Sequence, residues 1–322
     1  MNTAKLRIMA FLMVLCIFFS LPVFALGEDS GEAVPAESVI VQYETDDVMS
    51  FWELDNSLQI YCIPVGAQDC YLIVADGEAM VLDCAATGRD PTPDLLIRLL
   101  DGLGITRLRY ALNTHPHRDH IDGFPDLLAA VPADEFLTVF PLKYDATQRR
   151  IMRNLAELGI PVREYTAGEP LPLGNAKIDT YRYRKSKNTN DLSLVVHVQY
   201  GERSVLFTAD IGLTAQRKMA EEYWDAWDSD ILKLPHHGTC GLAKEMYNAA
   251  SPELCFASNG PTSKSTKLQK DFLAKRDCPV LFTSRQPLVM ITDGETWEIQ
   301  QWYADSIMLP NYTHIPEEEN DD

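Results

Sequence analysis

The stretch THPHRDHIDG, residues 114–123, crowds four potential metal ligands together: His115, His117, Asp119 and His120. The whole chain has only seven histidines among 322 residues, so this crowding is not expected by chance. Imidazole nitrogens and carboxylate oxygens bind zinc and similar divalent ions, and a catalytic site leaves a coordination position for water. The pattern therefore predicts a metal centre.

The spacing of these residues suggests room for two ions. His115 and His117 are two positions apart, so both can point the same way from an extended segment. Asp119 and His120 lie beyond a turn, where they can face a second ion a few ångströms away.

Strands must position these residues. LRYALNTH, residues 108–115, predicts a strand that runs into the motif, so the histidines are expected on a loop at its end. DILKLPHHG, residues 230–238, predicts another strand, which ends in His236 and His237. Predicted helices at 92–104 and 146–159 and hairpins at 70–84 and 192–211 complete an alternation of helices and strands.

Several segments share a resemblance to one family. THPHRDHIDG resembles the His-x-His-x-Asp-His signature of the metallo-β-lactamase superfamily, and VGAQDCYLIVADGEAMVLDCA is similar to its opening hairpin, with Asp83 at the conventional aspartate. VLFTADI resembles the strand that carries the metal-bridging aspartate, here Asp210. LKLPHHGT resembles most closely the hydrolase domain of ComEC-type competence proteins. The similarity spans about residues 58 to 300.

The resemblance implies an α/β fold, a four-layer αββα sandwich with the site at one edge of two sheets. The metal ligands that it implies come from the motif, the bridging position and the later histidine pair: His115, His117, Asp119, His120, Asp210 and His236. We favour His236 over His237 as the ligand because it directly follows the strand end. The catalytic residues implied are Asp119, Asp210 and His237.

The departures of the chain from the family pattern include two positions near the site. Asn190 stands where the superfamily has its third-motif histidine, so the first ion is expected to have fewer ligands and to bind more weakly. Ala209 replaces the glycine before the bridging aspartate. It supplies no ligand, so the substitution is expected to be tolerated.

The chemistry expected is hydrolysis assisted by one or two divalent ions, zinc or manganese. Such ions lower the pKa of a bound water toward neutrality and polarise the scissile oxygen. Asp210 would orient the nucleophile, and His237 or a water would protonate the leaving group.

The resemblance suggests a phosphodiester substrate, either nucleic acid or a smaller nucleotide. The net charge of −19 opposes a stable nucleic-acid complex. A small ester, a lactone or a β-lactam remains open, as does a binding module whose metal is purely structural. The sequence does not indicate an oligomeric state.

The N-terminal segment predicts export. Lys5 and Arg7 precede an apolar run that ends in small residues, which predicts a signal peptide at residues 1–25, with an uncleaved membrane anchor as the alternative. An acidic linker at 26–39, a hydrolase domain at 40–312 and an acidic tail at 313–322 follow. Cleavage would leave a secreted or extracytoplasmic protein without a membrane segment. Its remaining cysteines could pair or stay as buried thiols.

Three further features have ordinary structural explanations beside functional ones. His197 alternates with valines in a predicted strand, which favours a structural role. Asp83 is either a turn residue or a partner of a metal ligand. YRYRKSK, residues 181–187, is basic in an acidic chain and could receive a phosphate, but strand alternation with inward tyrosines explains it better.

Overall fold

The computed structural model describes residues 40–43, 55–85, 92–260 and 264–301. All of these residues belong to one compact unit, residues 38–322. The expected signal peptide, acidic linker and acidic tail lie outside the described residues.

One half of the fold is a nine-stranded mixed sheet with the order β1-β15-β14-β2-β3-β4-β5-β6-β7. Its strands are β1 (Ile40–Tyr43), β2 (Leu58–Cys62), β3 (Cys70–Ala75), β4 (Glu78–Cys84), β5 (Leu108–Asn113), β6 (Ala133–Thr138), β7 (Val162–Glu164), β14 (Leu288–Thr292) and β15 (Trp297–Gln301). The predicted hairpin at 70–84 forms as β3 and β4. Its turn residues Asp76 and Gly77 both have positive φ, as a tight two-residue turn requires.

The other half is a six-stranded sheet with the order β13-β12-β11-β10-β9-β8. Its strands are β8 (Lys177–Arg182), β9 (Leu194–Tyr200), β10 (Arg203–Phe207), β11 (Ile231–Lys233), β12 (Leu254–Ala257) and β13 (Val280–Phe282). The second predicted hairpin forms as the antiparallel pair β9 and β10, and Gly201 turns between them with a φ of 58°.

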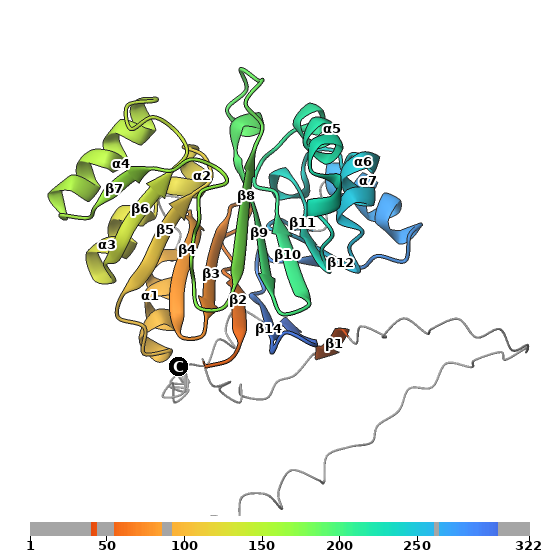
Figure 1. Cartoon of the computed structure of the whole chain (residues 1–322), viewed down its shortest axis with the longest axis horizontal. Coiled ribbons are helices and arrows are strands. Elements are labelled where there is room, and N and C mark those ends of the chain that lie inside the picture. The colour runs from red at the N-terminus through yellow and green to blue at the C-terminus, as the bar shows by residue number, and fades with distance from the viewer. Residues whose placement is uncertain (1–39, 44–54, 86–91, 261–263, 302–322) are drawn as a thin grey trace, which may run out of the picture. The chain divides into compact units, whose positions relative to one another are not determined.

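Helices cover the outer faces of both sheets, as Figure 1 shows. The α-helices are α1 (Thr92–Gly102), α2 (Arg118–Ile121), α3 (Phe124–Ala130), α4 (Ala146–Glu157), α5 (Leu213–Glu222), α6 (Lys244–Ala250) and α7 (Lys264–Ala274). Short 3-10 helices are η2 (Asn190–Leu192), η3 (Trp224–Ala226) and η4 (His236–Gly238). Among the described residues, no helix has the length and apolar character needed to cross a membrane.

Three apolar clusters match the four layers. One lies between the sheets and contains Ile73 of β3 and Phe207 of β10. The second joins the nine-stranded sheet to α1, α3 and α4 through residues such as Phe124, and the third joins the six-stranded sheet to α5 and α6. Because each strand buries alternate side chains on two faces, both sheets need a helical cover. The predicted αββα sandwich is thereby confirmed.

The sheets bring several chain segments to one edge. Strands β4 and β5 are parallel, as are β10, β11 and β12, so their carboxyl ends gather in each sheet. Strand β3 is antiparallel to β4, which places the residue before β3 at the same edge. The backbone N–H of Leu194 donates to the carbonyl of Thr114 at 3.1 Å, which joins the two sheets there.

All cysteines of the described residues are free thiols. The sulfurs of Cys255 and Cys278 lie 3.6 Å apart in the third apolar cluster, in contact but not bonded.

Candidate metal centre

Two groups of potential ligands meet at this edge, and Asp210 belongs to both. Asp210 follows β10 and is almost fully buried. One group adds His115 and His117, and the other adds Asp69, His120 and His237. The groups converge from the segments after β5, β10 and β11 and before β3.

The first group is compact. Nε2 of His115 lies 3.2 Å from Nδ1 of His117 and 3.7 Å from Oδ2 of Asp210. One potential ligand atom of each residue lies within 4.8 Å of those of the other two. This geometry suits a shared cation.

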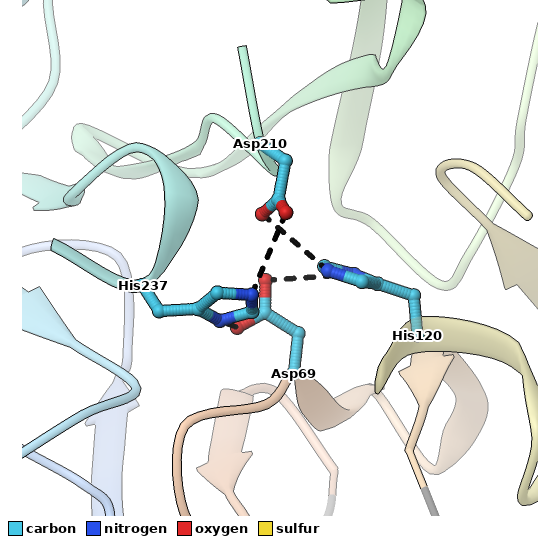
Figure 2. Close-up of side chains that lie close together, drawn as sticks. All are labelled: Asp69, His120, Asp210 and His237. Carbon is cyan, nitrogen blue, oxygen red and sulfur yellow. Dashed lines mark hydrogen bonds and ion pairs between the residues drawn. The ribbon is translucent and has the colours of Figure 1, made fainter. Parts of the chain in front are cut away.

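In the second group, four side chains point toward one another from four segments, as Figure 2 shows. Nε2 of His120 lies 3.4 Å from Oδ1 of Asp210, and Nε2 of His237 lies 3.5 Å from Oδ2 of the same carboxylate. Oδ2 of Asp119 lies 3.4 Å from Nε2 of His237. Asp119 is partly exposed, so it faces the open side of the centre.

Each histidine of the second group is oriented by a carboxylate behind it. Nδ1 of His120 lies 2.7 Å from Oδ2 of Asp83, and Nδ1 of His237 lies 3.1 Å from Oδ1 of Asp69. In metal sites, a carboxylate that accepts from the far ring nitrogen fixes the ring's tautomer and direction. Both Nε2 atoms are therefore turned toward Asp210.

A divalent ion fits this donor set. Four buried atoms of this group have no hydrogen-bond partner: Oδ2 of Asp69, which forms an ion pair with Lys233, and three that face the centre, Nε2 of His120, Nε2 of His237 and Oδ1 of Asp210. Unpaired buried polar atoms are costly, and three that converge point to a missing bound group. Imidazole and carboxylate donors match zinc and related ions.

The electrostatics also favour a cation. Burial alone raises the pKa of the Asp210 carboxyl, but the charges of His120 and His237 outweigh it and hold this pKa well below its usual range. Burial lowers the pKa of His120, yet Asp210 and Asp83 outweigh burial and raise this pKa to about 10. The carboxylates thus attract positive charge, and a metal would replace the protons that they attract.

A family model for the metallo-beta-lactamase superfamily matches residues 63–248, which include the His motif, Asp210 and His237. The chain belongs to the metallo-beta-lactamase superfamily.

Part of the chain is also similar to a curated protein. The chain is 29% identical over 183 residues to the uncharacterized protein YcaI of Escherichia coli; the match covers 56% of this chain and 22% of YcaI. The chain therefore spans about a fifth of the length of that relative.

Two solved structures share the fold at low identity. The metallo-beta-lactamase fold protein YhfI of Bacillus subtilis is 12% identical with a TM-score of 0.52, over 73% of this chain and all of YhfI. CmlA, a diiron beta-hydroxylase from Streptomyces venezuelae, is 15% identical with a TM-score of 0.51, over 73% of this chain and 54% of CmlA.

Four of the six predicted ligands, His115, His117, His120 and Asp210, lie in the two groups, whereas the predicted ligands Asp119 and His236 lie in neither. The structure brings His237, not His236, into the second group. Nε2 of His236 lies 3.6 Å from Oδ2 of Asp210, and its side chain is 37% exposed, against 4% for His237. The geometry favours His237 as the ligand and leaves His236 at the open side, which reverses the preference drawn from the strand end.

Backbone conformation explains this reversal. His236 and His237 both have left-handed φ, 51° and 54°, so the chain turns sharply after β11 and redirects the second ring inward. Ala209 also has a left-handed φ, 44°, a conformation that glycine adopts without steric cost. Left-handed non-glycine residues are strained and cluster at functional sites.

The structure leaves two other predicted positions outside the ligand groups. Asn190 lies in η2, which leads into β9 beside Thr114, and its Oδ1 is buried without a hydrogen-bond partner. His197 lies in β9 opposite Leu206, away from both groups, which fits its expected structural role.

Sequence reasoning missed two buried residues of the centre. Asp69 precedes β3, and Lys233 ends β11; the side chain of Lys233 is 0% exposed. Nζ of Lys233 lies 2.5 Å from Oδ2 of Asp69 and 3.9 Å from Oδ1 of Asp210. A lysine inside an apolar strand pattern was a signal, because a buried ammonium requires a carboxylate partner.

At the start of the basic segment 181–187, successive side chains point to opposite faces, as strand alternation predicts. Tyr181 and Tyr183 pack on the third apolar cluster. Arg182 points the other way, where its guanidinium donates to the backbone carbonyls of Val139 and Leu192.

Proposed function

We propose that this protein is an exported phosphodiester hydrolase of the ComEC-type group within the superfamily, dependent on zinc or manganese. The observation that carries the metal-dependent step is the sharing of Asp210 by two buried ligand groups. A divalent ion bound there supplies Lewis acidity at the scissile phosphoryl oxygen and a water of lowered pKa.

The chain's own residues divide the remaining work. Asp83 orients the ring of His120, and Asp69 orients the ring of His237. Asp210 lies between the two ligand groups as their shared carboxylate. Asp119 and His236 are the partly exposed groups at the open side. We assign to His236, in place of His237, the transfer of a proton to the leaving oxygen.

An anionic substrate is supported by a second feature. In a chain of net charge −19, basic side chains gather around a cavity of about 720 Å³ beside β8 and α5. Its basic and aromatic lining residues are Tyr181, Arg182, Tyr183, Arg184, Lys185, Lys218 and Tyr223. The guanidinium of Arg182 donates to the carbonyls of Val139 and Leu192, and the ammonium of Lys218 pairs with Glu221. The basic groups that can receive a phosphate here are therefore those of Arg184 and Lys185, and the tyrosine rings offer stacking surfaces. Glu221 and Glu222 also line this cavity, which favours a small or transiently bound substrate over a stable nucleic-acid complex.

The fold alone does not determine the reaction, because CmlA, which has a similar fold, is a diiron beta-hydroxylase. The test is a substrate panel offered to metal-free and metal-loaded full-length protein. The panel contains bis-p-nitrophenyl phosphate, single-stranded DNA, a lactone and a chromogenic β-lactam. We expect phosphodiester cleavage that chelator abolishes and zinc or manganese restores.

Other results would redirect the assignment. Turnover of only the lactone or β-lactam would replace the phosphodiester substrate. Metal binding without turnover of any panel member would favour a non-catalytic metal-binding module.

Export rests on the apolar N-terminal segment and on "VFA" at residues 23–25. The mass of protein recovered outside the cytoplasm should correspond to a chain that begins at Leu26. Intact protein held in the membrane fraction would instead identify an uncleaved anchor.

A further inference from the structure

Lys233 is a buried cation inside a site whose other charged groups are built to attract cations. Its Nζ contacts Oδ2 of Asp69 at 2.5 Å and donates to the backbone carbonyl of Ala209 at 3.0 Å. Its side chain does not reach solvent, so it cannot contact a substrate directly. Lys233 can therefore affect the site only through Asp69 and through the turn that contains Ala209 and Asp210.

Both oxygens of Asp69 are engaged. Oδ1 accepts hydrogen bonds from Tyr71 at 2.9 Å and from the hydroxyl of Ser258, and it meets Nδ1 of His237 at 3.1 Å. Oδ2 meets the ammonium of Lys233. Asp69 belongs to the second group, and its Oδ2 accepts no hydrogen bond, but the ion pair with Lys233 occupies this oxygen.

Lys233 also faces an oxygen that a metal would use. Oδ1 of Asp210 lies 3.4 Å from Nε2 of His120 and 3.9 Å from Nζ of Lys233. The first position, at His115 and His117, meets the other oxygen, Oδ2, at 3.7 Å from Nε2 of His115. Nε2 of His237 also meets Oδ2, at 3.5 Å, but Lys233 pairs with Asp69 of the second group and faces Oδ1, so the fixed positive charge lies closest to the second position.

We propose that Lys233 is a positioning residue that keeps Asp69 out of the metal coordination shell and weakens divalent-ion binding at the His120/His237 position. The inference rests on the metal binding part of the proposed function and is independent of the substrate. Like charges repel strongly over a few ångströms in a buried site, and removal of Lys233 also releases a carboxylate oxygen. Loss of Lys233 should therefore strengthen metal binding, whereas a purely structural role predicts the opposite.

The test is a charge series in the full-length protein: K233M, D69N, the double variant D69N/K233M, and K233R as the charge-conserving control. Zinc is titrated into each metal-free protein by isothermal titration calorimetry, and bound metal is counted by elemental analysis. Circular dichroism and thermal unfolding check that each variant is folded.

We expect the Kd of the second position to fall by on the order of tenfold or more in K233M. It should rise in D69N, which leaves Lys233 without its partner. In D69N/K233M, where the net charge of the pair is again zero, the Kd should return near that of the original protein. In K233R the Kd should also be close to that of the original protein. The His115/His117 position should change less throughout the series.

A folded K233M protein with unchanged or weaker binding at the second position would overturn the proposal. If K233M does not fold, the comparison of D69N/K233M with D69N decides, because only the charge effect predicts tighter binding in the double variant. Hydrolysis is not the readout. Failure of the substrate panel with this metal-affinity series intact would reject the proposed reaction and leave the role of Lys233 standing.

Discussion

Oδ2 of Asp83, at the end of β4, lies 2.7 Å from Nδ1 of His120, which follows β5 in the helix α2. Asp83 has a left-handed φ of 54°, and its other contacts go to the backbone N–H and hydroxyl of Thr114 and to the amide of Asn113. One buried carboxylate thus aligns the ligand ring and anchors the loop that carries the His motif. A simple turn residue would not need these contacts.

D83N should weaken metal binding by about 10- to 100-fold, the usual cost of losing a group that orients a ligand. It should also lower the free energy of unfolding by about 1–3 kcal/mol, because buried donors on Thr114 lose a charged acceptor. Zinc titration and urea unfolding measure the two effects. Unchanged zinc affinity in the folded variant would leave Asp83 with only a structural role.

H237A and H236A form a matched pair of neighbouring histidine variants. H237A should weaken the second metal step by more than the roughly 10- to 100-fold typical of an outer-shell change, because it removes a donor atom. H236A should leave both metal steps nearly intact and lower the rate of hydrolysis instead. The opposite outcome, with metal loss in H236A alone, would restore the preference based on the strand end.

D210N should impair both metal steps, since Asp210 lies in both ligand groups. An amide keeps the size of the carboxylate but removes its negative charge and one strong donor oxygen. H197A is the control, because His197 lies outside both groups, and it should keep both steps and lose only packing. Metal titration followed by elemental analysis distinguishes these results, and loss of one step in H197A would make His197 a ligand.

His197 should make stability depend on pH. Burial lowers the pKa of His197 to about 4, whereas an unfolded histidine titrates near about 6.5. Below about pH 6.5 His197 binds a proton in the unfolded chain but not in the folded protein. Its contribution to stability is therefore lost as pH falls toward about 4. The loss attributable to His197 should be about 2 kcal/mol between about pH 7 and about pH 5.

The measurement is urea unfolding of the original protein and H197Q at both pH values. The free-energy difference between the two proteins should shift in favour of H197Q at the lower pH. A constant difference would show that the pKa of His197 is the same in the folded protein and in the unfolded chain.

The local pattern of residues 115–120 was sufficient to predict a metal centre, because ligands two or three residues apart reach one point almost regardless of the rest of the fold. The alternation of strands and helices, with the superfamily resemblance, led to the αββα sandwich and to Asp210 as the shared ligand. These features depend on short-range periodicity and on motifs that are continuous in the sequence.

The tertiary structure alone decided what surrounds those ligands. The choice between His236 and His237 depends on the left-handed backbone conformation of two consecutive residues. Non-glycine residues rarely adopt this conformation, and residue type does not reveal it. The pairing of Asp69 with Lys233 joins residues more than 160 positions apart, one just before β3 and one at the end of β11, and neither segment by itself reveals its partner. Such partners are brought together by the packing of two sheets at a common edge, so the charge balance of the metal centre is a property of the assembled fold.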